Sequence, residues 1–225
     1  MTRDDVARQI ADELIRIAGA TIAERGRFTL AVPGGSVADV VLPLLAAAPI
    51  DWRPVDLFLA DDRVVDPESP ESNERLVREL LIEPLGPAAP TFHPLVTPGV
   101  ALAEAAARAE RDLTTTVGTP PRLDLVLLGV GEDGHVASLF PGHAALRDSA
   151  WVVPVEDAPK PPPTRLSLGL ETLATARRIW LAAFGAAKAP VVAELRGNPA
   201  SQLPAAIVAA RASDIRWWLD AGAGG

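Results

Sequence analysis

Largely apolar runs alternate with amphipathic helical patterns along this chain. The runs show little of the polar alternation of a half-exposed strand, which is typical of strands buried on both faces of a parallel sheet. They lie at residues 28–32, 55–59, 123–128 and 178–184. Apolar residues at helical spacing predict helices over residues 3–24, 37–48 and 99–116. This order predicts an α/β fold, a three-layer Rossmann-like arrangement of a mostly parallel twisted sheet flanked by helices.

Local signals set several boundaries. Thr2 and Asp5 form a capping-box pattern before the first helix, and Gly26 ends it. The buried face of this helix is expected to hold Val6, Ile10, Leu14, Ile17 and Thr21.

Shorter elements are expected between the main ones. Ser72 is placed to cap a helix that reaches Leu81. Brief strands are predicted near residues 91–94 and 151–155, and the prolines of 159–163 indicate a rigid connection. The end of the chain, from Gly222, is expected to fray.

Length and composition favour a single domain over residues 1–225, because no Pro-, Gly- or Ser-rich linker separates parts of different composition. With 48% apolar residues, the chain can bury a sizeable core. No apolar stretch approaches the roughly 18 residues of a membrane span, and no secretory pattern is present, which favours a cytoplasmic location without a membrane partner. The absence of cysteine excludes disulfides and thiolate metal sites. The oligomeric state stays open, and a monomer is compatible with the sequence.

The net charge of -8 argues against a nucleic-acid partner, whose binding requires a basic surface. An acidic protein that binds an anion must build a local positive pocket. Only two of the 21 basic residues are lysines, Lys160 and Lys188. Lys188 follows the strand at 178–184 and begins a helix, where the helix dipole disfavours a cation. This position indicates a bound anion.

The densest polar cluster follows the strand at 123–128, in the sequence Gly-Val-Gly-Glu-Asp-Gly-His of residues 129–135. Ligands of open α/β sheets lie at the carboxyl ends of strands. His135, beside Glu132 and Asp133, is therefore the first candidate for acid–base chemistry, with a satisfied loop histidine as the plain alternative. The Gly-x-Gly-x-x-Gly spacing fits NAD weakly, because no acidic residue ends a strand about 20 residues later. No cofactor is expected.

Two further strand ends carry polar residues. Gly34, Gly35 and Ser36 join the strand at 28–32 to a helix, which is the arrangement that aims free backbone N–H groups at an anion. A tight turn that needs glycine is the alternative. Asp61, Asp62 and Arg63 follow the strand at 55–59, where a surface ion pair is the simplest interpretation. These candidate residues form no spaced His/carboxylate cluster that would indicate a metal.

The stretch GVGEDGHVASLFPGH closely resembles the signature of the 6-phosphogluconolactonases, enzymes of the second step of the oxidative pentose phosphate pathway. The related glucosamine-6-phosphate deaminases carry a similar Gly-x-Asp-Gly-His core. The continuation Ser-Leu-Phe-Pro at 138–141, and Arg63 where deaminases have tyrosine, follow the lactonases. Motifs around Gly34, Arg165 and Lys188 also resemble this family, so the resemblance covers nearly the whole chain.

The resemblance implies a carboxylic ester hydrolase that converts 6-phospho-D-glucono-1,5-lactone to 6-phospho-D-gluconate, and the lack of a spaced ligand cluster predicts that it needs no metal. It implies that His135 is the general base and that Asp133 or Asp61 orients the imidazole or the water. Arg63 would stabilise the oxyanion or hold substrate hydroxyls. The residues implied to hold the phosphate are Gly34, Gly35, Ser36, Arg165 and Lys188.

The carboxylate partner of His135 is one of Asp61, Asp62, Glu132 and Asp133, and the neighbouring carboxylates are expected to raise the histidine pKa. The chain departs from the family pattern at Pro33, Val37 and Asp62, where serine, threonine and glutamate are usual.

Two rival functions remain. One is a glucosamine-6-phosphate deaminase, which Arg63 and the Ser-Leu-Phe-Pro segment disfavour. The other is a sugar-phosphate sensor, which would keep the phosphate loop and lose His135 and would normally be joined to a DNA-binding segment. No basic helix-turn-helix is recognised beside this domain.

Overall fold

The computed structural model describes all residues from 1 to 225 and is centred on a six-stranded sheet with the order β4-β2-β1-β5-β8-β9. Every pairing in it is parallel. Its strands are β1 (Phe28–Val32), β2 (Val55–Leu59), β4 (Thr91–His93), β5 (Leu125–Gly129), β8 (Ile179–Ala183) and β9 (Ile215–Leu219). The largely apolar runs therefore form strands as predicted, and β1 and β5 are completely or almost completely buried.

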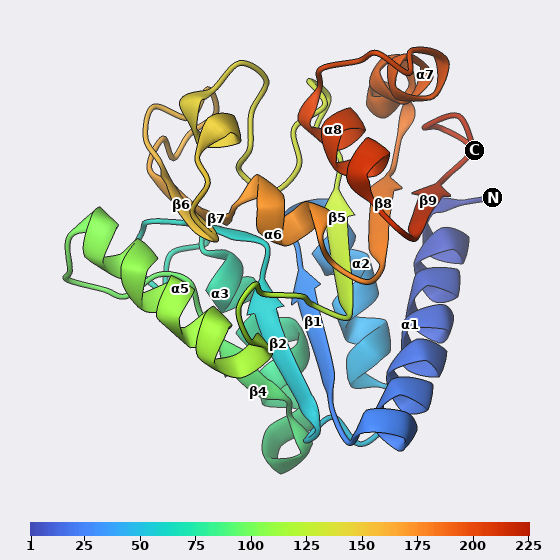
Figure 1. The fold of residues 1–225 in the computed structure, drawn as a ribbon. Helices are drawn as coiled ribbons and strands as arrows, with labels where there is room; N and C mark the ends of the chain where they lie inside the picture. The colour runs from blue at the N-terminus through green and yellow to red at the C-terminus, as the bar shows by residue number, and fades with distance from the viewer.

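Helices cover both faces of this sheet. In Figure 1, α2 lies behind the strands, while α5, α6 and α8 lie nearer the viewer. The helices are α1 (Arg3–Arg25), α2 (Gly35–Ala46), α3 (Asn73–Val77), α4 (Glu83–Leu85), α5 (Leu102–Val117), α6 (Leu170–Ala174), α7 (Ala189–Gly197) and α8 (Pro204–Arg211). Short turns of other helix types are η1 (Arg78–Ile82), η2 (Gly86–Ala88), η3 (Ala144–Arg147) and η4 (Ala186–Lys188). None of the helices combines the length and hydrophobicity that a bilayer crossing requires.

The first helix has the boundaries that its sequence predicts. The Thr2 side chain accepts from Asp5 N–H and the Asp5 carboxylate accepts from Thr2 N–H, which completes the capping box. Gly26 ends the helix in the left-handed conformation, at φ 76°. All five residues expected on the buried face are buried.

The helices α3 and α5 also differ from their predicted extents. Ser72 caps α3 through its side chain, but the α-helix ends at Val77 and continues as the wider π-helical turn η1. The helix α5 begins at Leu102 rather than at residue 99.

A second, antiparallel sheet was not predicted. It contains β3 (Asp61–Arg63), β7 (Arg165–Leu168) and β6 (Val152–Val155), in the order β3-β7-β6. The sequence indicated a strand only for the last of these, because the other two carry charged residues in short runs. In the β3–β7 register Arg63 lies opposite Arg165, and Asp61 opposite Ser167. This pairing brings residues about 100 positions apart to the same edge of the molecule.

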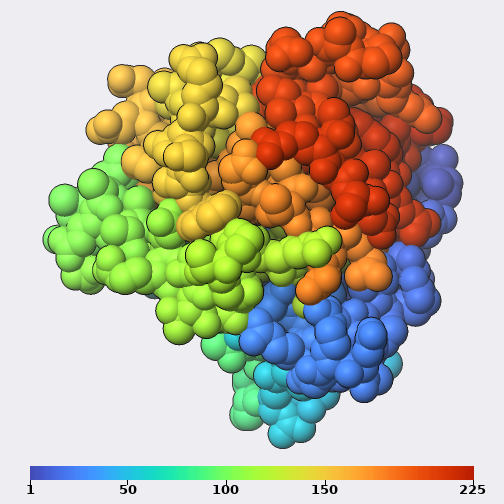
Figure 2. Space-filling model, in the orientation of Figure 1, coloured from blue at the N-terminus to red at the C-terminus, as the bar shows by residue number.

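The C-terminal segment is ordered, contrary to the expected fraying after Gly222. Ala223 is fully buried, and its N–H donates to the Asp220 carboxylate, which also accepts from Gly185 N–H. The two ends of the chain meet, as the blue and red segments at the right of Figure 2 show, and Ala221 N–H donates to Met1 C=O at 2.9 Å. One hydrophobic core of 62 buried residues extends through the structure.

Candidate active site

The cleft that holds the candidate residues lies between the carboxyl ends of β1 and β5, where the strand order reverses direction. Its volume is about 170 Å³. Eight of the nine predicted site residues line it: Gly34, Gly35, Ser36, Asp61, Arg63, His135, Arg165 and Lys188. The ninth, Asp133, hydrogen-bonds to His135. The parallel sheet explains this convergence, because all its strands end at one edge.

The loop after β1 presents backbone donors. Helix α2 begins at Gly35, two residues earlier than predicted, and no side chain caps it. Gly35 has φ +62°, a conformation that favours glycine. The N–H groups of Gly35 and Ser36 thus belong to the uncapped first turn of a twelve-residue helix, where the dipole favours an anion.

The two departures from the family pattern in this loop have simple structural consequences. Pro33 precedes the helix, so its missing N–H removes no donor from the first turn of α2. Val37 is 4% exposed and faces Gly129 of β5, which makes it a core residue. The loop therefore keeps its backbone donors without a hydroxyl at position 37.

Asn73 lines the cleft and was not among the predicted site residues, although Ser72-Asn73 lies in a loop bordering the site. Its side-chain amide occupies the space that a β-carbon on Gly34 would fill. Its Nδ2 donates to the Asp61 C=O at 2.8 Å. Asn73 thus joins the start of α3 both to the loop before α2 and to β3.

Lys188 approaches the same cleft from the turn after β8. Gly185, at φ +89°, starts this turn, and Lys188 is the N-cap residue of α7. No carboxylate lies within ion-pair distance of its ammonium group. Burial lowers the pKa of Lys188, partly against the attraction of Glu132. The cleft thus contains an unpaired ammonium and the uncapped N–H groups of α2. This combination indicates that the cleft binds an anionic ligand.

Arg165 was predicted to hold a phosphate, but most of its guanidinium hydrogen-bonds to backbone carbonyls of the protein. Its Nε donates to Pro162 C=O and its Nη2 to Lys160 C=O, at 3.0 and 2.9 Å. Only Nη1 faces Ser138 Oγ, at 3.4 Å, and the Asp61 carboxylate, at 4.0 Å. Burial lowers the pKa of this guanidinium below its ordinary value, and Asp61 opposes the shift. One edge of Arg165 is thus available to the cleft, while the other holds the adjacent loop.

Arg63 is also anchored. Its Nη1 donates to Glu71 C=O at 2.6 Å, and its buried Nε has no protein partner. Because Arg63 lines the cleft, the guanidinium hydrogens that Glu71 does not engage, other than the buried Nε–H, are available to substrate oxygens.

The carboxylate partner of His135 is Asp133, whose Oδ1 lies 2.5 Å from Nδ1 of the imidazole. Gly131 makes this pairing possible, since a β-carbon there would collide with both side chains. A neutral imidazole that donates from Nδ1 to Asp133 leaves Nε2 unprotonated, and no protein group bonds to that nitrogen.

The other three carboxylates have different surroundings. Asp61 accepts a 2.6 Å hydrogen bond from Ser138 Oγ, and Glu132 is exposed. Asp62 is buried and accepts from the N–H groups of Arg63, Asn73 and Glu74. Burial raises the pKa of Asp62 to about 6, although these three hydrogen bonds oppose the shift. Asp62 therefore fastens α3 to β3 and does not reach His135.

The expected direction of the His135 pKa shift was wrong. Burial lowers the pKa of His135 below 6.5, and the hydrogen bond and charge of Asp133 only partly offset it. The sequence showed the carboxylates but not the packing around the ring, which includes Phe140 at a centroid distance of 4.6 Å. For Asp133, burial acts to raise the pKa, but His135 and Lys160 outweigh it and the pKa is lowered.

The remaining histidines lie outside the cleft lining. His143 pairs with Glu156 C=O at 2.8 Å. His93, which has no charged neighbour in sequence, lies between Asp112 and Asp56 at 2.8 and 3.2 Å and stacks on Phe58. No group of three or more His, Cys, Asp or Glu side chains is arranged to hold a metal ion.

Comparisons with known proteins agree with the resemblance. The family model described as glucosamine-6-phosphate isomerases/6-phosphogluconolactonase matches residues 1–217. A 6-phosphogluconolactonase of Streptomyces coelicolor is 38% identical over 218 residues, which cover 89% of this chain and 82% of the relative. One of Rattus norvegicus is 36% identical over 213 residues, with coverages of 91% and 82%. The crystal structure of a 6-phosphogluconolactonase from Shewanella baltica superposes with a TM-score of 0.84 at 29% identity, over 98% of this chain and 96% of that one. A monomeric glucosamine-6-phosphate deaminase, at 20% identity and a TM-score of 0.79, covers 99% of this chain and 96% of its own and shares the fold.

Proposed function

The chain belongs to the glucosamine-6-phosphate isomerase/6-phosphogluconolactonase family, and we infer that it is an enzyme that hydrolyses 6-phospho-D-glucono-1,5-lactone to 6-phospho-D-gluconate. This is the second step of the oxidative pentose phosphate pathway. One observation carries the catalytic assignment: a histidine–carboxylate pair and an uncapped helix N-terminus with an unpaired lysine border the same cleft. Within the family, Arg63 and the Ser-Leu-Phe-Pro segment at 138–141 favour the lactonase over the deaminase.

We propose that the phosphate binds at the α2 end of this cleft. The N–H groups of Gly35 and Ser36 and the ammonium of Lys188 supply donors, and Nη1 of Arg165 adds a further one. Gly34 contributes by being small enough for Asn73 to lie against it. A phosphate of charge about -1.5 to -2 would compensate the unpaired cations there.

His135 acts at the other end as the general base. Its Nε2 takes a proton from water as the water oxygen bonds to C1 of the lactone, and the carbonyl π electrons move onto the carbonyl oxygen. When the tetrahedral intermediate collapses, the bond between C1 and the ring oxygen breaks and His135 returns the proton to that oxygen. The carboxylic acid of the product then loses its proton to solvent. Asp133 holds the imidazole and favours its protonated form during the reaction.

Arg63 and Asp61 have supporting roles in this proposal. The guanidinium hydrogens of Arg63 that face the cleft stabilise the oxyanion or hold substrate hydroxyls. The Asp61 carboxylate accepts a hydrogen bond from Ser138 and lies near Arg165. In this proposal Asp61 orients the Ser138 hydroxyl and the Arg165 guanidinium, and it does not orient the imidazole of His135.

A direct assay tests the function. The purified protein should hydrolyse the phosphorylated lactone well above its spontaneous rate, measured at matched buffer, and should keep full activity in excess EDTA. Loss on chelation with recovery by one divalent metal would contradict the metal-independent mechanism. Deamination of glucosamine 6-phosphate in place of lactone hydrolysis would instead favour the rival activity.

The proposal extends to assembly and location. We propose a single-domain monomer that acts in the cytoplasm on this small molecule without a nucleic-acid partner. Met1 is the only large hydrophobic residue that is strongly exposed, which supports the monomer. Light scattering of the purified protein at micromolar concentration tests the monomer.

A further inference from the structure

Lys160 is the one lysine besides Lys188, and it also lies near the catalytic pair. Its ammonium is 3.9 Å from Oδ1 of Asp133, the oxygen that accepts from His135. The other 19 basic residues of the chain are arginines. Lys160 and Lys188 come from different connections, after β6 and after β8, and the fold brings both to the same end of the molecule.

The segment that carries Lys160, residues 156–164, joins β6 to β7 (Figure 1). Hydrogen bonds hold it at several points. His143 bonds to Glu156 C=O at its start, and Ala158 N–H donates to Pro163 C=O across it. Arg165 then binds the backbone carbonyls of residues 160, 161 and 162 with two of its nitrogens. The backbone beneath Lys160 is therefore fixed by a residue that lines the cleft.

We propose that Lys160 is a further active-site residue, whose ammonium faces the reacting carbonyl end of the substrate while Lys188 faces the phosphate. This role rests on the proposed lactone hydrolysis. Water attack places a negative charge on the former carbonyl oxygen, and the product carries a carboxylate at the same carbon. A cation beside the His135–Asp133 pair stabilises both charges, and a flexible lysine stem lets a compact ammonium follow the oxygen.

The electrostatics of the pair agree with this position. The charged groups that act on His135 are Asp133 and Asp61, which raise its pKa, and Lys160, which lowers it. Lys160 therefore helps to keep His135 unprotonated, and hence basic, at lower pH.

A purely structural role for Lys160 predicts different behaviour. Its side chain is 47% exposed, and 3.9 Å is a long separation for an ion pair. An exposed pair of this kind contributes little to stability, so a structural role would leave catalysis and stability almost unchanged on substitution.

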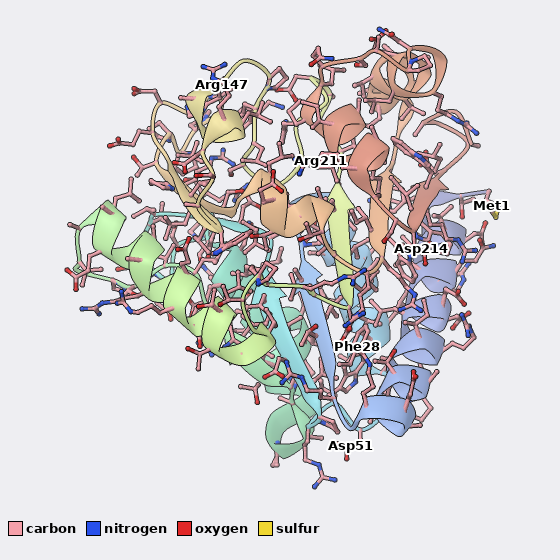
Figure 3. All side chains as sticks on the ribbon, viewed as in Figure 1. Met1, Phe28, Asp51, Arg147, Arg211 and Asp214 are labelled. Carbon is pink, nitrogen blue, oxygen red and sulfur yellow. The ribbon has the colours of Figure 1, made fainter.

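The test compares Lys160→Met and Lys160→Arg with a control, Arg147→Met. Arg147 also carries a positive charge, but it points outward from η3, as its label at the upper left of Figure 3 shows. Lys160→Met should lower kcat about tenfold to a hundredfold, somewhat less than the loss of a buried oxyanion donor because Lys160 is half exposed. The KM should change little, and the acidic limb of kcat/KM should move to higher pH.

The remaining variants complete the test. Lys160→Arg should restore part of kcat and the position of the limb, and Arg147→Met should match the wild type. The melting temperature of Lys160→Met should change by less than about 4 °C. Wild-type kcat in Lys160→Met, or a raised KM at unchanged kcat, would overturn the role of Lys160 alone. A wild-type enzyme without lactonase activity would instead overturn the proposed function, and this role with it.

Discussion

The side-chain amide of Asn73 fills the space that a β-carbon on Gly34 would occupy. This contact joins the loop before α2 to the start of α3, and Asn73 also donates to Asp61 C=O. Substrate binding at the proposed phosphate site is therefore expected to depend on Asn73, which lies outside the loop of residues 34–36.

Gly34→Ala tests this contact. The added methyl group must displace Asn73, so we expect a loss of about 1–3 kcal/mol in the free energy of unfolding, as for other overpacked sites, together with a higher KM for the phosphorylated lactone. Denaturant unfolding and steady-state kinetics measure both. Gly19→Ala in α1 is the matched control, because nothing lies within 4 Å of its β-carbon position. That change should stabilise the protein by about 0.4–1 kcal/mol. An unchanged KM in Gly34→Ala would show that Asn73 can move without cost to binding.

His135→Asn should lower kcat by roughly 100- to 10,000-fold, the usual contribution of a general base. The affinity for 6-phosphogluconate should change little, because the proposed phosphate ligands lie on other loops. Rates above the spontaneous background and calorimetric binding of the product provide the two measurements. His93→Asn serves as the control, since His93 bridges Asp112 and Asp56 outside the cleft and should retain the wild-type kcat. A folded His135→Asn enzyme with most of its rate would make Asp61 the next candidate base.

The pH dependence follows from the lowered pKa of His135. The base must be neutral, so kcat/KM should fall as the pH drops through a pKa below the ordinary value of about 6.5. Asp133→Asn removes a group that raises this pKa, which should move the limb to still lower pH. It should also reduce kcat by about a hundredfold or more, because the tautomer is no longer fixed. An acidic limb above 6.5 in the wild type would contradict the dominance of burial.

Lys188→Met should raise the KM for the phosphorylated lactone about 10- to 150-fold, equivalent to roughly 1.5–3 kcal/mol for a hydrogen bond to a charged group. The slow turnover of unphosphorylated gluconolactone should hardly change, and this substrate is the internal control. Equal losses on both lactones would mean that Lys188 has a structural role.

Asp62 should make stability fall as the pH rises. Its pKa is raised to about 6 in the folded protein, so between the unfolded pKa of 3.8 and that value the native state binds more protons than the unfolded chain. Its contribution is complete below the unfolded pKa and is lost as the pH rises through about 6. The loss is on the order of 3 kcal/mol. Asp62→Asn, followed by urea unfolding at pH 4 to 7, should remove this decrease. A variant curve parallel to the wild type would show that Asp62 does not titrate in this range.

Much of the fold was predictable because its signals are local. The buried runs of β1, β2, β5 and β8, the capping box at Thr2 and the glycine turns each depend on residues near one another in sequence. A parallel sheet then brings the ends of its strands together without further information. The sequence could therefore group Gly34, Asp61, His135 and Lys188 near one edge.

Other features depend on contacts that the sequence does not display. The pairing of β3 with β7 joins short polar segments about 100 residues apart, and it decides that Arg165 faces Ser138 and Asp61. The Asp220 hydrogen bonds order a tail that its composition predicts to fray.

Tertiary structure also decided which of the four nearby carboxylates pairs with His135. Asp62 accepts hydrogen bonds from N–H groups at the start of α3, and Asp61 accepts one from Ser138. Asp133 hydrogen-bonds to His135, where Gly131 leaves room for the pair. The sequence determined that His135 lies among carboxylates, which alone would raise its pKa. Only the packed structure determined how far the ring is removed from water, and that burial reverses the sign of the shift because it penalises the charged imidazolium more than Asp133 stabilises it.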